Sequence, residues 1–372
     1  MNIEEIAKGL LSDLVDIDSV SGNEKLIADY VEGFFEDLKV FEVERIENRI
    51  VAKTNFGLAK RLILAGHLDT VPISKVTNNY PSKIVENNGS TEIWGRGTVD
   101  MKGGDAVMLM IAAKVMKATP KYDLTFVFYD NEEVEAPKNG LGKLVKSNPK
   151  LLNGDMAILF EPTNGYLEGG CNGTLRFDIV LKGKAAHSAR AYKGDNAIHK
   201  LLPILQILNN WNGDLDKLAE NHTVNVEGLD YIEGLNAVKI NGGITTNSIP
   251  DECRIHINYR FAPNKSAKEA QKCILDLFDG FEVDWKDVSD GAKPGMNRAE
   301  LQEFAKIIKE KTGKDARAKL GWTDVARFTE LKIPAVNFAP GDPNLCHADD
   351  EHIELNSIVE CFSVLGTFIF AE

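Results

Sequence analysis

The sequence lacks paired cysteines, long apolar runs and an excess of basic residues. Its five cysteines are scattered among 372 residues without a Cys-x-x-Cys pair, which fits buried thiols in a reducing compartment. No apolar run has the ~20 residues needed to cross a bilayer, and the N-terminus lacks the basic and apolar regions of a signal peptide. The net charge of −13 argues against nucleic acid or anionic membranes as partners. We therefore expect a cytoplasmic protein that acts on a small molecule.

Ligand-type side chains recur in short polar motifs along the chain. Asp100 lies in the glycine-rich run 95–104, and its carboxylate can bind two metal ions at once. A catalytic zinc ion has three protein ligands and keeps one position open for water. Two histidines, two glutamates and one shared aspartate would give each of two zinc ions three ligands. The set is His67, Asp100, Glu133, Glu161 and His347.

These motifs follow short apolar runs. Residues 61–66 end at His67, 124–129 precede Glu132–Glu133, 156–160 end at Glu161, and 334–338 precede the loop of His347. Continuous apolar runs of this length are typical of buried parallel strands. Open α/β sheets carry their chemistry beyond the carboxyl ends of such strands. The pattern therefore predicts one site at one edge of a sheet.

Simpler interpretations exist for individual residues. A single histidine or Glu-Glu pair is more often a surface or core group than a ligand. Gly95 and Gly97 suggest a dinucleotide loop, but the third glycine and the following acidic residue are missing. Cys346 could be a soft metal ligand, although oxygen and nitrogen donors already fill the site. Asp69 is either an ordinary strand-end residue or a carboxylate that orients the His67 imidazole.

Strands alternating with helices predict an α/β layer fold for the first part of the chain. Helices are expected at 3–17, after a capping box at Ser21 to Glu24, at 105–113 and at 355–370. From residue 174 the pattern changes to half-exposed strands at 174–182, 237–240, 253–261 and 281–285. Helices at 195–211 and after Ser266 complete an α+β insert. We expect a discontinuous catalytic domain (1–173 and 290–372) and an inserted domain (174–289), since one core rarely grows this large.

The motifs resemble those of the dinuclear zinc aminoacylase and glutamate-carboxypeptidase family over essentially the whole chain. The matching segments are His67-Leu68-Asp69, Asp100-Met101-Lys102-Gly103, Glu132-Glu133, Glu161-Pro162-Thr163 and His347. The resemblance implies a zinc-peptidase-like catalytic domain with a mixed central sheet flanked by helices. It also implies that the insert is a lid through which two chains form a homodimer. Two zinc ions per chain are expected, with cobalt or manganese as possible substitutes.

The same resemblance implies a role for each site residue. One zinc ion would be held by His67, Asp100 and Glu161, and the other by Asp100, Glu133 and His347. Glu132 would be the general base, and His187 of the lid would stabilise the oxyanion. The expected substrate contacts are Arg260, Asn247, Arg190 and Thr323, with a surface position as the alternative for Arg260 and Asn247. The peptide bond after Asp100 is expected to be cis.

Within the family, the chain resembles the actinobacterial type of succinyl-diaminopimelate desuccinylase. The segments that carry this resemblance are 186–190, 194–199, 321–328 and 338–344. It departs from many desuccinylases at 170–173, where Gly-Cys-Asn-Gly replaces Gly-Arg-Arg-Gly, and after the lid histidine, where a proline is missing. These departures affect the substrate rim, so acetylornithine and other N-acyl amino acids or dipeptides remain alternative substrates. A non-catalytic binding protein on a degenerate hydrolase fold is the remaining alternative.

Overall fold

The computed structural model describes residues 2–87 and 89–371, which form two compact units. The larger unit comprises Met1–Gly170, Pro294–Arg317 and Thr323–Glu372, and the smaller unit comprises Cys171–Lys293 and Ala318–Trp322. The sequence-based boundaries differ because they assign 171–173, 290–293 and 318–322 to the catalytic part. Hydrogen bonds explain the difference. The amide of Asn172 donates to the carbonyl of Lys319, and Cys171 and Ala292 exchange two backbone hydrogen bonds.

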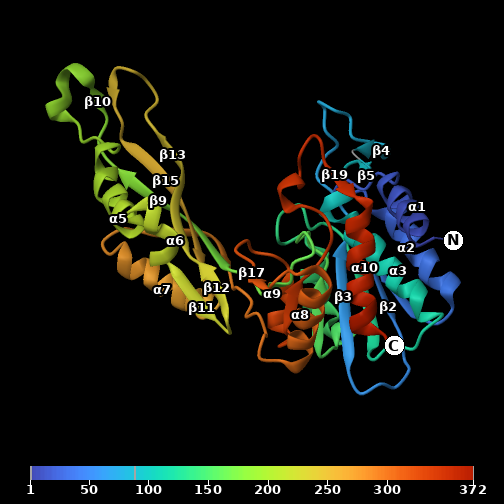
Figure 1. Cartoon of the computed structure of the whole chain (residues 1–372). Coiled ribbons are helices and arrows are strands. Elements are labelled where there is room, and N and C mark those ends of the chain that lie inside the picture. The colour runs from blue at the N-terminus through green and yellow to red at the C-terminus, as the bar shows by residue number, and fades with distance from the viewer. Residues whose placement is uncertain (1, 88, 372) are drawn as a thin grey trace. The chain divides into compact units, whose positions relative to one another are not determined.

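An eight-stranded mixed sheet forms the centre of the larger unit (Figure 1). Its strands, in spatial order, are β1 (Glu42–Ile46), β2 (Arg49–Lys53), β6 (Asp123–Tyr129), β3 (Arg61–His67), β7 (Met156–Leu159), β18 (Ala335–Asn337), β8 (Glu168–Gly169) and β17 (Arg317–Ala318). Four strands in the middle of the sheet, β6, β3, β7 and β18, are parallel to one another. On one side of them β2 pairs antiparallel with β6 and β1 with β2, and on the other side β8 pairs antiparallel with β18. The prediction that the apolar runs form buried parallel strands is confirmed.

Helices bury both faces of this sheet. The helices are α1 (Ile3–Val15), α2 (Lys25–Leu38), α3 (Gly103–Val115), α4 (Gly140–Ser147), α8 (Ala299–Thr312), α9 (Val325–Glu330) and α10 (Leu355–Ile369). Along β3, Leu62 and Leu64 join the main core, whereas Ile63 and Ala65 are buried outside that core. Because successive strand residues point to opposite faces, a strand buried at every position must be covered on both sides.

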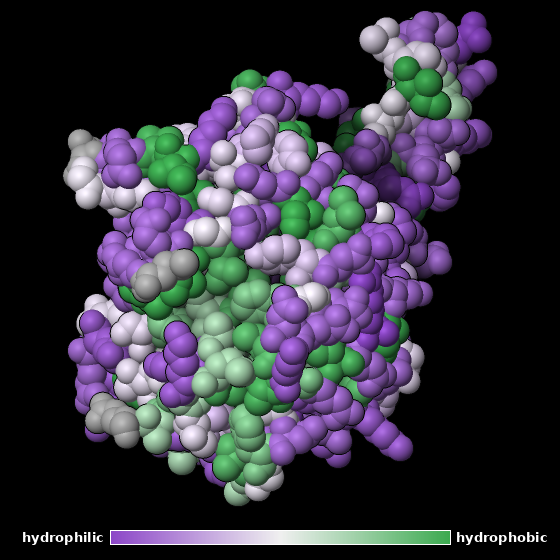
Figure 2. Space-filling model, turned by 90° about the vertical axis from the view of Figure 1, so that its right-hand side faces the viewer, coloured by the Kyte–Doolittle hydropathy of each residue, from purple (hydrophilic) through white to green (hydrophobic). Residues whose placement is uncertain are grey.

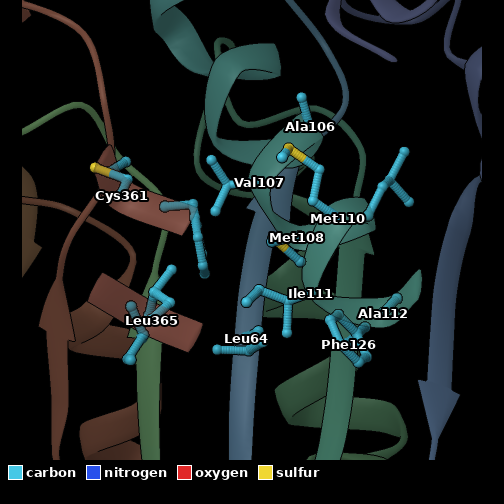
Figure 3. Close-up of a cluster of buried hydrophobic side chains, with 14 of the residues drawn as sticks. Leu64, Ala106, Val107, Met108, Met110, Ile111, Ala112, Phe126, Cys361 and Leu365 are labelled. Atoms are coloured by element: carbon cyan, nitrogen blue, oxygen red, sulfur yellow. The ribbon is translucent and has the colours of Figure 1, made fainter. Parts of the chain in front are cut away.

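Helix α3 lies in the main core, and its residues from Gly103 to Ala112 are all buried. Figure 3 shows Met108 and Ile111 near Leu64 of β3, with Leu365 of α10 close by. Gly104 lets the start of α3 approach β7, since a Cβ there would lie 2.6 Å from the carbonyl oxygen of Phe160. The helix expected at 105–113 is therefore confirmed and slightly longer.

The predicted capping box at Ser21 to Glu24 is wrong. The N-cap of α2 is Glu24, which has no side-chain cap hydrogen bond. The hydroxyl of Ser21 donates instead to the Asp69 carboxylate, and Glu24 accepts from the amide of Gly22. The Ser21 hydroxyl thus donates to a distant carboxylate and does not accept from a local backbone amide as a capping box requires.

The smaller unit is a four-stranded antiparallel sheet with helices on one face. Its strands are β13 (Gly234–Gly242), β15 (Glu252–Phe261), β9 (Gly173–Lys182) and β16 (Val283–Ser289), and its longer helices are α5 (Leu202–Asn212) and α7 (Ala267–Leu277). Both helices contribute buried side chains to one core with the sheet. The capping box of Ser266 and Glu269 at α7 is confirmed.

One helix of this unit begins later than expected. We predicted a helix over 195–211, but α5 begins at Leu202, after a short 3-10 turn at His199–Leu201. The Asn196 side chain accepts hydrogen bonds from the amides of Ile198 and His199, which holds a turn there. Pro203 then fits the first turn of the helix, where no amide donor is needed.

Short elements complete both units. One is the three-stranded sheet of β19 (His352–Glu354), β5 (Ser90–Trp94) and β4 (Lys83–Asn87). Two are strand pairs, β10 (Ala186–His187) with β14 (Ser248–Ile249) and β11 (Thr223–Val226) with β12 (Leu229–Ile232). The last is the short helix α6 (Leu218–Asn221).

Among the described residues, no helix combines the length and the apolar character that crossing a bilayer requires. Figure 2 shows hydrophilic side chains over much of one face, as the high content of charged residues leads one to expect.

Candidate metal centre

Four of the five expected ligands lie at or after the carboxyl ends of four neighbouring strands in the larger unit. His67 is the last residue of β3, and Glu133 follows β6 by four residues. Glu161 lies two residues beyond β7, and His347 lies in the loop after β18. Asp100 comes from the segment Thr98–Lys102 just before α3, and its peptide bond to Met101 is cis, as the resemblance implied.

Four of these side chains meet around the Asp100 carboxylate. Its Oδ1 lies 3.1 Å from Nε2 of His67, and its Oδ2 lies 3.3 Å from Nε2 of His347. The same nitrogen of His347 is 3.0 Å from Oε1 of Glu133. Glu161 is nearby, with its Oε1 3.9 Å from Nε2 of His67. One carboxylate thus contacts both histidines through different oxygens, the arrangement that a carboxylate bridging two metal ions needs.

Donor atoms of His67, Asp100 and Glu133 all lie within 4.8 Å of one another, close enough to hold one ion. Imidazole nitrogen and carboxylate oxygen suit zinc and related divalent metals. The chemistry of this donor set therefore fits a metal centre.

Imidazole and carboxylate groups strongly perturb each other's pKa values in the metal-free site. Burial disfavours a charged His67, but the hydrogen bond and charge of Asp100 outweigh it and raise the His67 pKa well above its usual value. Hydrogen bonds to Asp100 and Glu133 raise the pKa of His347 to about 10. Burial opposes ionisation of Asp100, yet the hydrogen bonds from His347 and His67 hold its pKa below the usual range. Without metal, both pKa shifts therefore favour the protonated imidazoles.

Metal binding should release protons, and the affinity should rise with pH. A ligand histidine must be neutral, so each raised pKa means a proton that the metal has to displace. His347, whose pKa is about 10, starts protonated between pH 6 and 8, and the raised pKa of His67 favours the same state, so we expect up to about two protons released on filling both sites. Calorimetric titration with zinc in buffers of different ionisation enthalpy measures that number. Equal affinity at pH 6 and pH 8 would contradict this assignment.

Asp69 holds the turn that carries Glu132 and Glu133. Its Oδ1 accepts from the amide of Glu132 at 2.8 Å, and its Oδ2 accepts from the amide of Glu133 at 3.0 Å. The hydroxyl of Ser21 donates to the same Oδ2 at 2.6 Å. His67 donates through Nδ1 to the backbone carbonyl of Asp69 at 2.9 Å, whereas the nearer carboxylate oxygen is 3.7 Å away. The expected role of Asp69 is therefore corrected: its carbonyl orients the imidazole, and its carboxylate positions the glutamates.

Replacing Ser21 by alanine should lower kcat/KM about tenfold, because the Asp69 carboxylate loses one of three donors. A hydrogen bond to a charged group contributes roughly 1.5–3 kcal/mol. Ser19→Ala is the matched control, since this buried hydroxyl donates to the carbonyl of Leu68 at 2.8 Å and does not touch Asp69. Steady-state kinetics and thermal melting of both variants decide the matter. A fall in Tm with unchanged turnover in Ser21→Ala would mean that Ser21 only supports the fold.

Glu351 is a second positioning carboxylate, and no sequence motif marks it. It is buried and accepts backbone hydrogen bonds from Gly97 (3.0 Å), Val99 (3.0 Å) and Asp100 (3.2 Å). The Arg96 guanidinium donates to it at 2.7 Å. Consecutive backbone amides that converge on a carboxylate form an anion-binding nest. This nest fixes the backbone that leads into Asp100.

Glu132 lies beside the ligands without joining the contacts around Asp100. Burial raises its pKa well above the usual value, and the nearby charge of Glu161 adds to this rise. A carboxyl group with a raised pKa is a better proton acceptor near neutral pH.

Cys346, the alternative soft ligand, also has a raised pKa, first because of burial and then because of the Asp100 charge. Its thiol is therefore protonated in the metal-free site.

The other expected site residues occupy different surroundings. His187, Arg190 and Asn247 are exposed in the smaller unit, where Nδ1 of His187 accepts from the amide of Ala189 at 3.1 Å. Arg260 of the same unit is half-buried on β15. Thr323 belongs to the larger unit, but it is buried and its hydroxyl donates to the Asn337 side chain at 3.0 Å. The contact of Thr323 with the substrate rim stays a prediction.

Residues 63–371 match the model of peptidase family M20/M25/M40. A relative from Corynebacterium glutamicum named succinyl-diaminopimelate desuccinylase is 42% identical over 365 residues, covering 96% of this chain and 94% of that protein. A Mycobacterium tuberculosis relative, whose name also contains succinyl-diaminopimelate desuccinylase, is 44% identical over 365 residues and 97% of each chain.

Solved structures share the fold at low sequence identity. A tripeptidase from Staphylococcus aureus superposes with a TM-score of 0.77 at 23% identity, covering 98% of this chain and 97% of that one. An M20 family metallo-carboxypeptidase from Sulfolobus solfataricus has a TM-score of 0.73 at 18% identity, with 99% and 98% covered. A dinuclear metal-binding M20 peptidase from Bacillus subtilis has a TM-score of 0.64 at 16% identity, with 98% and 97% covered.

Proposed function

Because the chain belongs to peptidase family M20/M25/M40, we propose that it is a metal-dependent amide hydrolase that removes succinate from N-succinyl-LL-diaminopimelate. The observation that carries the reaction type is the Asp100 carboxylate, which contacts both candidate ligand histidines through separate oxygens. The observation that carries the substrate is the identity of 42–44% to desuccinylase relatives over nearly the whole chain. Such an enzyme would serve diaminopimelate and lysine biosynthesis in the cytoplasm.

The donor set supports two zinc ions that share Asp100. His67 and Glu161 would complete one site, and Glu133 and His347 the other. Bound zinc polarises a carbonyl group and lowers the pKa of water towards ~7. The Asp69 and Glu351 carboxylates support this role because they hold the backbone of the ligand loops.

Glu132 would take the proton from the attacking water and return it to the leaving amine. Its position supports this role, since the Asp69 carboxylate fixes its amide beside that of a ligand residue. Its raised pKa supports proton uptake near neutral pH. Hydrolysis of the amide then yields succinate and LL-diaminopimelate.

A small substrate panel tests the function. The zinc-loaded protein should hydrolyse N-succinyl-LL-diaminopimelate with a kcat/KM well above that for N-acetylornithine or a dipeptide. The release of succinate and of free amine is measured for each compound under the same conditions. Faster hydrolysis of acetylornithine or of the dipeptide would change the substrate while keeping the reaction. Absence of turnover on all three despite full metal loading would reject the enzyme assignment.

We also propose that the smaller unit is a lid that forms a homodimer and that His187 completes the partner's site. The exposure of His187 supports this role, because its imidazole is free to meet another molecule. Mixing His187→Ala with Glu132→Gln under subunit exchange should restore activity, because a mixed dimer then has one site with both groups intact. Each variant alone should be nearly inactive. No recovery despite proven exchange would mean that His187 does not act across the dimer.

A further inference from the structure

His347 lies farther from its strand than the other candidate ligands that follow strands. His67 is the last residue of β3, whereas His347 follows Asn337, the last residue of β18, by ten residues. The His347 side chain is 51% exposed, and its backbone has a φ of 62°. A residue other than glycine keeps such a conformation only where its surroundings impose it. Contacts outside β18 must therefore fix the position of this imidazole.

Arg96 binds the chain immediately after His347. Its Nη1 donates to the carbonyl of Ala348 at 3.2 Å and to Oε2 of Glu351 at 2.7 Å. Its Nε donates to the carbonyl of Pro72 at 3.1 Å. The Arg96 side chain is buried, so little water competes for these acceptors. Arg96 therefore joins the loop of His347 to the segment that contains Pro72.

Residues 72–79 hold the same loop through a second set of hydrogen bonds. The hydroxyl of Ser74 donates to Oδ1 of Asp349 at 2.5 Å, and the hydroxyl of Thr77 donates to the backbone carbonyl of Asp349. Ser74 is buried, as Arg96 is. The two residues that directly follow the ligand histidine are thus both bound, one by Arg96 and the other by Ser74 and Thr77.

Backbone pairing brings Arg96 to this loop. Strands β5 and β19 pair antiparallel, with Trp94 opposite His352, and the amide of Gly95 donates to the carbonyl of Glu351 at 3.1 Å. Arg96 comes next along the chain and meets the residues that precede Glu351. A guanidinium is a planar fork with five N–H donors, whereas a lysine ammonium is a compact charge on a flexible stem. The contacts of Arg96 therefore depend on the shape of the guanidinium as well as on its charge.

We propose that Arg96 and Ser74 are positioning residues for His347 and set the affinity of one of the two metal sites. This inference rests on the proposed function, because it takes His347 and Glu133 as ligands of one ion. The side chains of these two residues already meet, with Nε2 of His347 3.0 Å from Oε1 of Glu133. Residues that hold a metal ligand in place typically change metal affinity by about 10- to 100-fold when they are replaced.

A different route leads from Arg96 to the shared aspartate. Glu351 accepts from Arg96 and also from the amide of Asp100 at 3.2 Å. A change transmitted along this route would weaken both metal sites equally, since both use Asp100. Arg96→Lys keeps a positive charge for Glu351 and removes the planar fork, so we expect it to act chiefly through the lost contact with Ala348.

Variants that bind one ion separate the two sites. Glu133→Gln removes a ligand of the His347 site, so its remaining ion reports on the His67 site, and Glu161→Gln does the reverse. Zinc affinity is measured by calorimetric titration of each variant with and without Arg96→Lys. Added to Glu161→Gln, Arg96→Lys should weaken zinc binding about 10- to 100-fold. Added to Glu133→Gln, it should leave the zinc affinity unchanged.

Arg61→Lys is the matched control. The Arg61 side chain also donates to two backbone carbonyls, those of Leu124 at 3.0 Å and Thr54 at 2.8 Å. Arg61 begins β3, at the end of the strand opposite to His67. This substitution should therefore change the zinc affinity of neither single-site variant.

Ser74→Ala provides a second test, which stands even if Arg96→Lys does not fold. It should weaken the ion of Glu161→Gln and spare the ion of Glu133→Gln. Equal weakening in both variants would assign the effect to Asp100 and overturn the proposal, as would unchanged zinc affinity with a lower Tm. Zinc binding needs no substrate, so the result is independent of the desuccinylase assignment. Wild-type protein that binds no zinc would instead reject the metal centre, and this inference with it.

Discussion

Replacing Asp100 by alanine should remove both metal ions and all measurable turnover. The Asp100 carboxylate is the group that contacts both His67 and His347, so neither ion would keep its three protein ligands. Metal analysis of the purified variant, together with the activity on the best substrate of the panel, measures both losses.

Cys346→Ala is the matched control for this experiment, since the Cys346 thiol lies close to Asp100 and is protonated in the metal-free site. The control should retain two ions per chain. Two tightly bound ions in Asp100→Ala would reject the bridging role. A lost ion in Cys346→Ala would make the thiol a ligand after all.

Glu132→Gln and Glu133→Gln should fail in different ways although the residues are adjacent. Glu132→Gln should keep both metals and lose about 10²- to 10⁴-fold in kcat, because only proton transfer is removed. Glu133→Gln should weaken one metal site, since the Glu133 carboxylate contacts His347 at 3.0 Å. Metal content and kcat, measured side by side, separate the two roles. Metal loss in the first variant with full loading in the second would reverse the assignment.

Local sequence patterns predicted much of the architecture and the ligand set. Apolar runs that end in polar motifs identified β3, β6 and β7, because burial on both faces requires continuous apolar residues. The shared edge of these strands then explains why His67 and Glu161 lie near each other although 94 residues separate them. Alternation along 174–182 likewise predicted β9 with one open face.

The groups that position the ligands could not be predicted in the same way. Ser21 matches a local capping pattern, yet its hydroxyl bonds to Asp69, which is 48 residues away. Glu351 lies 252 residues from Val99, and nothing in its own segment marks it as the acceptor of the Val99 amide. Each case depends on which distant donor folding brings within reach. Helix α5 began late for a related reason, because Asn196 bonds to the backbone that follows it.

The Glu351 nest has a consequence for the order in which the protein matures. The bridging Asp100 and its neighbours are synthesised long before Glu351, whose carboxylate holds their amides from 251 and 252 residues away. A nascent chain that ends just before Glu351 already contains all five candidate ligand side chains but lacks the carboxylate that accepts from those amides. The amides of Val99 and Asp100 therefore gain this acceptor only when nearly the whole chain has been synthesised. We therefore expect metal capture to follow the synthesis of Glu351.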